Sequence, residues 1–380
     1  MKTYLIIGNG VAGTTAAGEI RKNDPDGAIT IVTEEQFPFY SRIKLPYYLA
    51  GHEERSGLSI RKEQWYEDNK IDLHTNIKIV DIDAAEKKAI DGKGTGWQYD
   101  ELLIATGSRS FVPPITGKDL ANVFTLKTVD DADRIIAAAR TAKNTVAIGG
   151  GLLGLEAAYG LIQRGLSVTV VEFFDRLLPR QMDSEGALLL KEMLENQGFA
   201  FRLGTKTSQI KGETEVKKVM LESGEELSAD MVLFSAGVRS NLDLPAKLSL
   251  ETEQGVVVNG AMATGTAGIY AAGDVAQFDK TNFCIWPEAQ EQGRIAGANM
   301  AGNVSETFKT VVPSNRLKVA GIELASAGEI DPDGTLESEV EQQDQVYRKI
   351  VKKEGKPVGC IMLGNTSGFS KLVKQMGLAG

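Results

Sequence analysis

Apolar and glycine positions follow the same pattern in two stretches of the chain. In the first, the apolar residues 4–7 lead into the turn GNGVAG at 8–13, a periodic apolar segment at 14–21 and a second apolar run at 29–32. In the second, residues 146–148 lead into GGGLLG at 149–154, a periodic segment at 155–164 and an apolar run at 167–171. Short apolar runs bounded by turns predict buried strands, and the 3.6-residue period predicts helices. The sequence therefore predicts two βαβ units.

Each turn has the spacing G-x-G-x-x-G, and this spacing has a physical reason. The first glycine permits a tight turn, the second lets the backbone approach a pyrophosphate, and the third lets the helix pack on the strand. The helix N-terminus supplies N–H groups for the phosphates. An acid that can bind a ribose hydroxyl pair follows each second strand, namely Glu34 or Glu35 in the first unit and Glu172 in the second. We expect one nucleotide in each unit.

The rest of the pattern predicts an internal duplication. Apolar runs at 102–107 and 231–237 both end in small residues, and each follows its own glycine turn. Helices are expected at 63–69, at 129–142 with Thr128 near the N-cap, and at 184–196 with Asp183 or Ser184 as the cap. A strand is expected at 77–82. Residues 36–51 are rich in aromatics and prolines and predict a loop that lines a ligand.

Composition and charge narrow the function classes. The 380 residues are 42% hydrophobic and 24% charged, which suits two to three domains with sizeable cores. The net charge of −9 argues against nucleic acid as the main partner. No apolar run reaches the roughly 18 residues of a membrane span, and the N-terminus is better interpreted as a strand than as a signal peptide. Cys284 and Cys360 form neither a disulfide framework nor a metal cluster, so we expect no metal and a cytoplasmic location.

Further motifs make the chain resemble a known family. The segments ATG at 105–107 and AGD at 272–274, together with both glycine turns, resemble the FAD-dependent pyridine-nucleotide oxidoreductases that have two dinucleotide-binding domains. Finer motifs are similar to NADH:rubredoxin reductases and to the flavin module of assimilatory nitrite reductase large subunits. These motifs are PFYSR at 38–42, GGLLGLE at 150–156, RQMD at 180–183, WPEAQEQG at 286–293 and PSNRLKVAG at 313–321.

The resemblance implies an α/β fold with two Rossmann-like domains and a small α+β C-terminal domain. The FAD domain would comprise 1–110 and 238–305, the NAD(P)H domain would be inserted at 111–237, and 306–380 would form the C-terminal domain. In such proteins Glu34, with Glu35 as the second choice, binds the adenosine ribose of FAD, and Asp274 binds a ribityl hydroxyl. The implied FAD residues are Gly8, Gly10, Val11, Ala12, Gly13, Glu34, Glu35, Arg42, Lys44, Ile79, Ala105, Thr106, Gly107, Gly273, Asp274, Glu288 and Ala289.

The implied nicotinamide nucleotide site favours NADH over NADPH. A carboxylate at Glu172, followed by Phe173 and Phe174, would bind two ribose hydroxyls and repel a 2′-phosphate. Arg176 lies close to Glu172 in the sequence, so NADPH stays an alternative ligand. The residues implied for this site are Gly149, Gly151, Leu152, Leu153, Gly154, Glu172 and Gly237.

The chemistry that the sequence lacks is also informative. Disulfide reductases of this fold use a C-x4-C pair beside the flavin and a His–Glu base near the C-terminus, and this chain has neither. Hydride transfer from nicotinamide to flavin needs no acid or base, only stacked rings. We expect Lys44 and Glu156 to pair beside the reactive nitrogen of the flavin and to stabilise its reduced form. The alternative is a surface lysine and a plain helix-start glutamate.

The electron acceptor is inferred from the C-terminal charges. Residues 345–380 contain one acid, Glu354, and the basic residues Arg348, Lys349, Lys352, Lys353, Lys356, Lys371 and Lys374. Such a surface could steer a small acidic electron carrier such as rubredoxin, although a solvated face is the alternative. The sequence therefore favours an NADH:rubredoxin-type reductase. An NADH oxidase, a reductase component for another carrier such as a nitrite reductase partner, and a non-catalytic NADH sensor are the alternatives.

Overall fold

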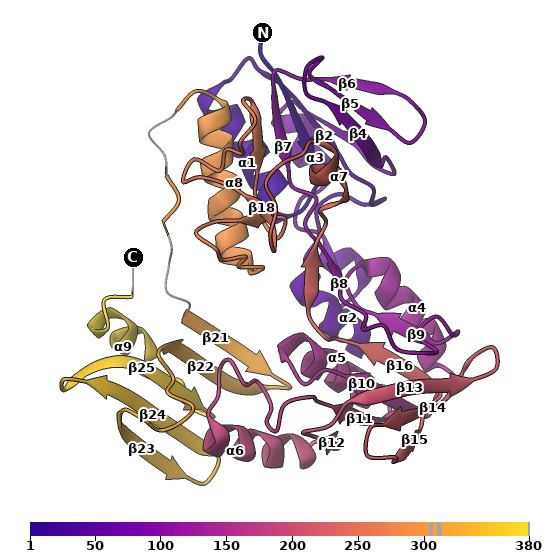
Figure 1. Cartoon of the computed structure of the whole chain (residues 1–380), viewed down its shortest axis with the longest axis vertical. Coiled ribbons are helices and arrows are strands. Elements are labelled where there is room, and N and C mark those ends of the chain that lie inside the picture. The colour runs from indigo at the N-terminus through magenta and orange to yellow at the C-terminus, as the bar shows by residue number, and fades with distance from the viewer. Residues whose placement is uncertain (304–306, 310–313, 379–380) are drawn as a thin grey trace. The chain divides into compact units, whose positions relative to one another are not determined.

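The computed structural model describes residues 1–303, 307–309 and 314–378, and the chain forms two compact units (Figure 1). The first consists of Met1–Ser41, Ser56–Arg109 and Val238–Thr310, and the second of Arg42–Arg55, Ser110–Gly237 and Val311–Gly380. The expected boundary between 305 and 306, and Pro313 of the motif at 313–321, lie outside the described residues. The three-domain division stays a prediction.

A five-stranded parallel sheet forms the core of the first unit, in the order β19-β7-β1-β2-β3. These strands are β1 (Thr3–Ile7), β2 (Ala28–Val32), β3 (Ile71–His74), β7 (Glu101–Ile104) and β19 (Ile269–Ala271). Helices α1 (Val11–Asn23) and α8 (Trp286–Met300) lie side by side next to this sheet (Figure 1). Glycines permit this close approach, because a Cβ atom at Gly293 would come within 2.4 Å of the Ala12 carbonyl oxygen. The nucleotide turn that precedes α1 therefore has α8 as an immediate neighbour.

Smaller elements complete the first unit. They are the helices α3 (Glu63–Asp68) and α7 (Asp243–Lys247), the 3-10 helix η2 (Arg55–Leu58), the antiparallel strands β4 (Ile79–Asp83), β5 (Lys88–Asp91) and β6 (Gly96–Gln98), the parallel pair β18 (Val256–Val257) and β20 (Ala276–Gln277), and the two-stranded sheet of β8 (Ser108–Ser110) and β17 (Val238–Ser240).

The second unit repeats the parallel-sheet architecture, in the order β12-β11-β10-β16-β9. Its strands are β9 (Val123–Thr125), β10 (Asn144–Ile148), β11 (Ser167–Val171), β12 (Phe199–Arg202) and β16 (Met231–Phe234), and its helices are α2 (Leu45–Ala50), α4 (Val129–Ala139), α5 (Leu152–Gln163) and α6 (Ser184–Glu195). The predicted caps are confirmed, because the Thr128 side chain accepts a hydrogen bond from the Asp131 N–H and the Asp183 side chain accepts one from the Gly186 N–H. An antiparallel sheet of β13 (Thr207–Gly212), β14 (Val216–Leu221) and β15 (Glu226–Ser228) also belongs to this unit.

The C-terminal part of the second unit is an antiparallel sheet in the order β21-β22-β25-β24-β23. Its strands are β21 (Ser314–Val319), β22 (Ile322–Gly328), β23 (Glu337–Gln343), β24 (Val346–Lys353) and β25 (Lys356–Leu363), followed by helix α9 (Phe369–Gln375). Tyr347 and Leu363 of this sheet share one buried cluster with Leu190 and Leu194 of α6. The predicted fold class, two Rossmann-like sheets and a small α+β part, is therefore confirmed.

Two local expectations differ from the structure. Helices α1 and α5 begin at Val11 and Leu152, three residues earlier than predicted, because Gly10 and Gly151 are the N-caps and the residues after them are already helical. The segment 36–51, predicted as a loop, contains the 3-10 helix η1 (Arg42–Lys44) and α2. Proline is tolerated in a first helical turn, so Pro46 does not prevent α2 from forming.

Candidate functional site: two nucleotide cradles

The first glycine turn forms a cradle that is closed toward the protein and open toward a ligand. A Cβ atom at Gly8 would come within 2.1 Å of the Ala105 carbonyl oxygen, and one at Gly13 within 2.0 Å of the Gly8 carbonyl oxygen. A Cβ atom at Gly10 would meet nothing within 4 Å. Helix α1 has no side-chain N-cap and no acid in its first turn. Its first N–H groups, at Val11 and Ala12, therefore suit an anion.

The second glycine turn has the same geometry. A Cβ atom at Gly149 would come within 2.3 Å of the Ser235 carbonyl oxygen, and one at Gly154 within 2.2 Å of the Gly149 carbonyl oxygen, while Gly151 is open. Helix α5 also lacks a side-chain cap and an early acid. Leu152 and Leu153 form its first turn, and the Leu153 side chain is exposed. The two cradles thus fit two phosphate-bearing ligands.

The Glu172 carboxylate is fixed by the backbone of the second cradle. Its Oε2 accepts a hydrogen bond from the Gly150 N–H at 2.5 Å, and its Oε1 accepts one from the Phe174 N–H at 2.9 Å. The side chain is buried, with 8% of the residue exposed. Each carboxylate oxygen still has acceptor capacity, so the group can bind hydroxyls. Phe173 and Phe174 beside it are half exposed, and Lys206 lies over the Phe173 ring.

Glu34 and Glu35 of the first cradle stand one and two residues further along the chain than the position that corresponds to Glu172 in the second cradle. The Gly8 N–H donates to Val32 and the Gly149 N–H donates to Val171, so Thr33 occupies the position of Glu172. Glu34 is mostly exposed and lies 3.7 Å from Lys78, whereas Glu35 accepts a hydrogen bond from the Tyr40 hydroxyl at 2.5 Å. The sequence spacing alone did not reveal this offset between the two cradles.

Asp274 joins three segments of the first unit. Its Oδ2 accepts a hydrogen bond from the Ser108 hydroxyl at 2.6 Å, and its backbone oxygen accepts bonds from the Ser240 hydroxyl and the Asn282 amide. The preceding Gly273 N–H donates to the Gln292 side chain of α8 at 2.8 Å. The structure therefore brings Gly273 next to α8 and to Ala12 of the first cradle, and Asp274 directly follows it.

Helix α8 contributes a buried carboxyl at its first turn. The residues Glu288 and Ala289 are buried, and Glu288 Oε2 has no hydrogen-bond partner within the residues the structure describes. Burial raises the pKa of Glu288. The N-cap residue of this helix, Ile285, supplies no side-chain cap, Pro287 has no N–H, and the Ala289 N–H already donates to the Ile285 carbonyl oxygen.

The remaining predicted residues have local roles that the structure makes visible. The Ala105 N–H donates to Ile7, and the carbonyl oxygens of Thr106 and Gly107 accept bonds from Asn241. Gly237 has a φ of 93° and its carbonyl oxygen accepts a bond from the Phe111 N–H. Ile79 is buried and opens β4.

Lys44 and Glu156 each have a partner other than the one expected. Lys44 Nζ lies 2.8 Å from Glu53, and the neighbouring Arg42 donates to the Lys127 carbonyl oxygen. Glu156 Oε1 accepts a hydrogen bond from the Ala320 N–H at 2.6 Å. The pair between Lys44 and Glu156 stays a prediction, and the Ala320 contact was not foreseen.

We expect the Glu156→Gln variant to become more stable than the wild-type protein as the pH rises. Burial raises the pKa of Glu156, although the Ala320 N–H and Lys318 act against this. A carboxyl with a raised folded-state pKa stabilises the fold when protonated, and this contribution is lost as the pH rises through that pKa. Glutamine keeps an acceptor for Ala320 and carries no charge. Thermal unfolding should therefore show a higher Tm than wild type at about pH 8 and little difference at about pH 4, and a pH-independent difference would contradict this reasoning.

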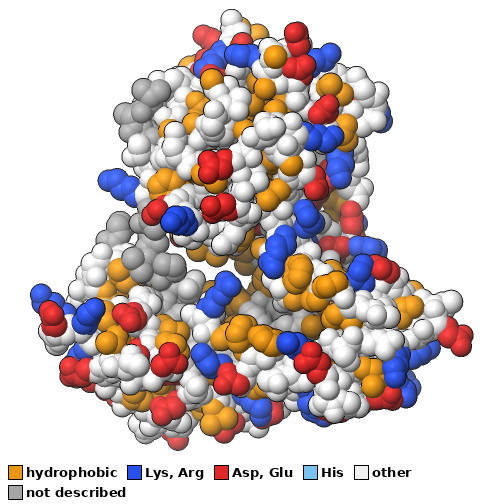
Figure 2. Space-filling model, in the orientation of Figure 1, with side chains coloured by type: hydrophobic (Ala, Val, Ile, Leu, Met, Phe, Trp, Pro, Cys, Tyr) orange, Lys and Arg blue, Asp and Glu red, His pale blue; other side chains and the backbone are white. Residues whose placement is uncertain are grey.

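The predicted basic surface at the C-terminus needs a correction. Lys349 is buried, donates to the Asp331 carbonyl oxygen and lies 3.1 Å from Asp183, so it is not part of any surface. Strand β23 places Glu339 against Lys352 and Glu341 against Arg348. Figure 2 accordingly shows acidic and basic side chains interspersed over this part of the chain. Four lysines of the predicted basic surface are exposed, namely Lys353, Lys356, Lys371 and Lys374.

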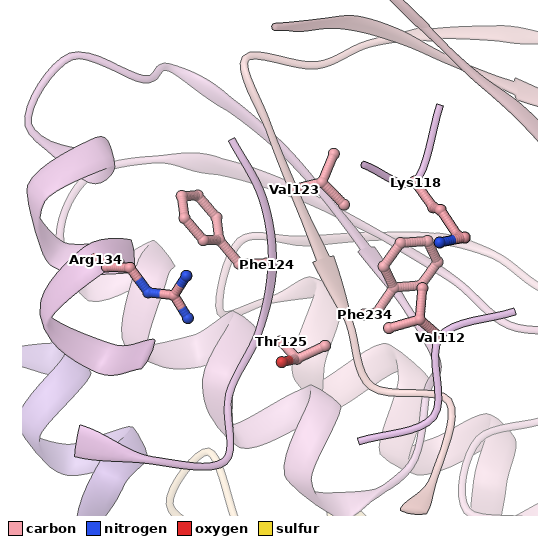
Figure 3. Close-up of a pocket in the computed structure, with 7 residues that line it drawn as sticks. All are labelled: Val112, Lys118, Val123, Phe124, Thr125, Arg134 and Phe234. Carbon is pink, nitrogen blue, oxygen red and sulfur yellow. The ribbon is translucent and has the colours of Figure 1, made fainter. Parts of the chain in front are cut away.

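A pocket of about 180 Å³ lies beside the edge strand β9 and contains none of the predicted site residues. It is lined by Val112, Lys118, Val123, Phe124, Thr125, Arg134 and Phe234 (Figure 3). Its two cations are each paired with a neighbouring acid, Lys118 with Asp119 and Arg134 with Asp131. We therefore assign no ligand to it.

Among residues 1–303, 307–309 and 314–378, no three His, Cys, Asp or Glu side chains are grouped as a metal site would require. Within the same ranges, no helix has the length and apolar character that crossing a membrane requires.

Known proteins match this arrangement along the whole chain. Residues 2–293 match the family model described as pyridine nucleotide-disulphide oxidoreductase, and residues 313–377 match the one described as rubredoxin NAD+ reductase C-terminal domain. The NADH:rubredoxin oxidoreductase structure from Clostridium acetobutylicum superimposes with a TM-score of 0.84 and 28% identity, covering 100% of this chain and 96% of that one.

Two relatives illustrate the range of similar proteins. The nitrite reductase [NAD(P)H] of Bacillus subtilis (strain 168) is 34% identical over 98% of this chain and 46% of its own length. The NADH oxidase of Methanocaldococcus jannaschii is 34% identical over 85% of this chain and 75% of its own length. The chain spans about half the length of the first curated relatives it matches.

Proposed function

We propose, because this chain belongs to the pyridine nucleotide-disulphide oxidoreductase family, that it is an FAD-dependent NADH oxidoreductase that passes electrons to rubredoxin. The observation that carries the acceptor is the match of residues 313–377 to the C-terminal domain of rubredoxin reductases. The similarity to the rubredoxin oxidoreductase of Clostridium acetobutylicum over nearly the full length of both chains supports the same choice.

The two cradles fit the nucleotides that this family binds, FAD and NADH. FAD would be held by the first cradle with Gly273, Asp274 and the start of α8, and NADH by the second cradle with Glu172. When bound, FAD would supply the redox chemistry of electron transfer from NADH to an acceptor. The task of the chain is to hold and orient the two nucleotides. Asp274, which accepts a hydrogen bond from Ser108, would accept another from a ribityl hydroxyl of the ligand.

We infer a preference for NADH from the fixed position of Glu172. Because two backbone N–H groups hold its carboxylate, the negative charge cannot turn away from a 2′-phosphate. For the adenosine ribose of FAD, Glu35 is favoured over Glu34 because it is anchored by Tyr40. The ratio of kcat/KM for NADH and NADPH measures the preference, and a ratio below one would refute it.

We also propose that no thiol takes part in the reaction. The two cysteines, Cys284 and Cys360, do not form a C-x4-C pair, and burial raises the pKa of the Cys360 thiol, which disfavours the reactive thiolate. Lys44 and Glu156 remain our proposal for the groups that support the reduced flavin. An unchanged stopped-flow rate of flavin reduction by NADH in a Lys44→Met variant would remove Lys44 from this role.

An acceptor panel tests the proposed function. Purified protein loaded with FAD should oxidise NADH slowly in air and much faster when oxidised rubredoxin is added, measured by NADH absorbance. The matched control is ferredoxin, a carrier of similar size, which should produce a smaller increase. The observation that favours an oxidase is the similarity to the Methanocaldococcus enzyme, and oxygen consumption equal to NADH consumption without any carrier would support it instead. Slow turnover with every acceptor would indicate a sensor.

The contribution of charge to docking is tested by salt. The exposed lysines at 353, 356, 371 and 374 are the remaining candidates for attracting an acidic carrier. If they do so, the rate of rubredoxin reduction falls as the ionic strength rises. A rate that does not depend on salt would exclude electrostatic docking, but it would not contradict rubredoxin as the proposed acceptor.

A further inference from the structure

The C-terminal sheet reaches the helix of the second cradle through a two-residue turn. Ala320 and Gly321 connect β21 to β22, and the residues on either side of them, Val319 and Ile322, pair directly. Both central residues have positive φ, 48° at Ala320 and 84° at Gly321, as in a type I′ hairpin turn. Glycine adopts this backbone freely, whereas alanine in the left-handed region is strained. Ala320 therefore has a conformation that its own side chain disfavours.

Ala320 is held against α5 by packing and by one hydrogen bond. It is 2% exposed and belongs to the same buried cluster as Leu155 of α5. Its N–H donates to Glu156 Oε1 at 2.6 Å. Both residues lie in the second unit, although 164 positions separate them in the sequence. The strained turn thus joins the C-terminal sheet to a carboxylate of α5.

A second turn of the same kind in this sheet lacks the burial. Glu354 and Gly355 connect β24 to β25 between the paired residues Lys353 and Lys356, and their φ values are 54° and 74°. Glu354 is exposed, as is usual for the tip of a hairpin. The burial of Ala320 is therefore particular to the β21–β22 turn and is not a general requirement of such hairpins.

Glu156 lies close to the second cradle and keeps one accessible oxygen. It is the fifth residue of α5, one turn after Leu152 at the start of the helix. Side chains of a helix lean toward its N-terminus, which for α5 is the end at the glycine turn. The residue is half-buried. Its second oxygen, Oε2, has no hydrogen bond within the described residues and is not enclosed by them, so another group can approach it.

Two groups of the β21–β22 hairpin favour the charged form of Glu156. Burial raises the pKa of Glu156, whereas the Ala320 N–H and the Lys318 ammonium act to lower it. Lys318 is exposed and stands in β21, two residues before Ala320. Within the described part of the chain, Lys318 is the charged side chain that acts on this carboxylate. Both opposing groups therefore come from the C-terminal sheet.

We propose that the β21–β22 turn completes the site that reacts with NADH, and that Ala320 is a positioning residue whose N–H fixes the Glu156 carboxylate. Lys318 acts on the same carboxylate through its charge. The inference rests on the proposed function, in which Glu156 supports the reduced flavin. It gives the C-terminal sheet a part in the reaction with NADH, in addition to the docking of an electron carrier.

Stopped-flow reduction of the FAD-loaded full chain by NADH, measured as a function of pH, tests the proposal. Glu156→Gln removes the titrating group, so the pH step that belongs to Glu156 should vanish. Ala320→Pro removes the N–H, because proline has none and cannot adopt a φ of 48°. This variant should move the step to higher pH by about one unit. Lys318→Gln should move it in the same direction by about half a unit at low salt and by less at high salt.

The matched control is Glu354→Pro, which places a proline at the same position of the exposed hairpin turn and should leave the pH profile unchanged. The Tm of each variant checks folding, and Lys318→Gln keeps the test available if Ala320→Pro does not fold, because Lys318 is exposed. Profiles of wild type and Glu156→Gln that coincide at every pH would overturn the inference and leave the proposed function standing. A step that neither Ala320→Pro nor Lys318→Gln moves would also overturn it. Absence of flavin reduction by NADH in wild type would instead remove the proposed function.

Discussion

Replacing Gly10 by valine should give a folded protein that no longer retains FAD. Gly10 has an extended backbone, with φ −89° and ψ −162°, which valine adopts readily. An added Cβ atom meets nothing within 4 Å in the chain, so the fold has room for the side chain. In the proposed function, the space it fills is the one through which a pyrophosphate would approach the start of α1. We expect FAD affinity to fall by about 100-fold or more, equal to about 2.7 kcal/mol.

The second cradle offers the matched experiment. Gly151 also has an extended backbone and an open Cβ side, so Gly151→Val should keep FAD and lose NADH. The flavin absorbance per protein measures FAD, and the concentration of NADH needed to bleach the flavin measures NADH binding. Gly265→Val is the control, because Gly265 is open in the same way but lies outside both turns. Retention of both nucleotides by both variants would show that the glycine turns are not the binding sites.

Replacing Asp183 by alanine should destabilise the second unit by about 3–5 kcal/mol, the usual cost of leaving a buried charge without its partner. Asp183 caps α6 through the Gly186 N–H, accepts a bond from the Tyr347 hydroxyl at 2.6 Å and pairs with Lys349 at 3.1 Å. The side chains of Asp183 and Lys349 are both 7% exposed. In the variant the buried Lys349 ammonium would lose its ion pair with Asp183 and keep its hydrogen bond to the Asp331 carbonyl oxygen.

Thermal unfolding measures this loss, and a fall in Tm of about 10 °C is expected for a unit of this size. Tyr347→Phe separates the components, because it removes one hydrogen bond and keeps the ion pair, which should cost about 1 kcal/mol. Lys191→Ala on the same helix breaks an exposed pair with Glu195 and should change stability by less than about 0.5 kcal/mol. An Asp183→Ala variant as stable as Lys191→Ala would show that the buried network contributes nothing.

The glycine turns and the family could be predicted from sequence because their signals are local. A G-x-G-x-x-G turn between an apolar run and an apolar-periodic segment needs only neighbouring residues to be recognised, and Thr128 and Asp183 were identified as caps in the same way. The match of residues 2–293 to the family model confirms the resemblance that the motifs predicted. The residue roles in the two nucleotide sites remain predictions that the variants above test.

The burial of Lys349 could not be predicted from charge counting. On the sequence it is one of several basic residues in a row, and only the strand register decides which of them points outward. Successive side chains of β24 alternate between faces, so Lys349 points toward Asp183 while Arg348 and Lys352 meet the acids of β23. The expected basic surface was wrong at this residue for that reason.

The sequence by itself determined a set of local requirements: two open glycine turns, buried strands before and after them, and the absence of a C-x4-C cysteine pair. What only the tertiary structure decided is which distant side chains meet. Tyr66 reaches Asn9 from 57 positions away, and Ala320 reaches Glu156 from 164 positions away. The physical reason is that backbone conformation depends on neighbouring residues, whereas the direction of a buried hydrogen bond depends on how separate elements pack.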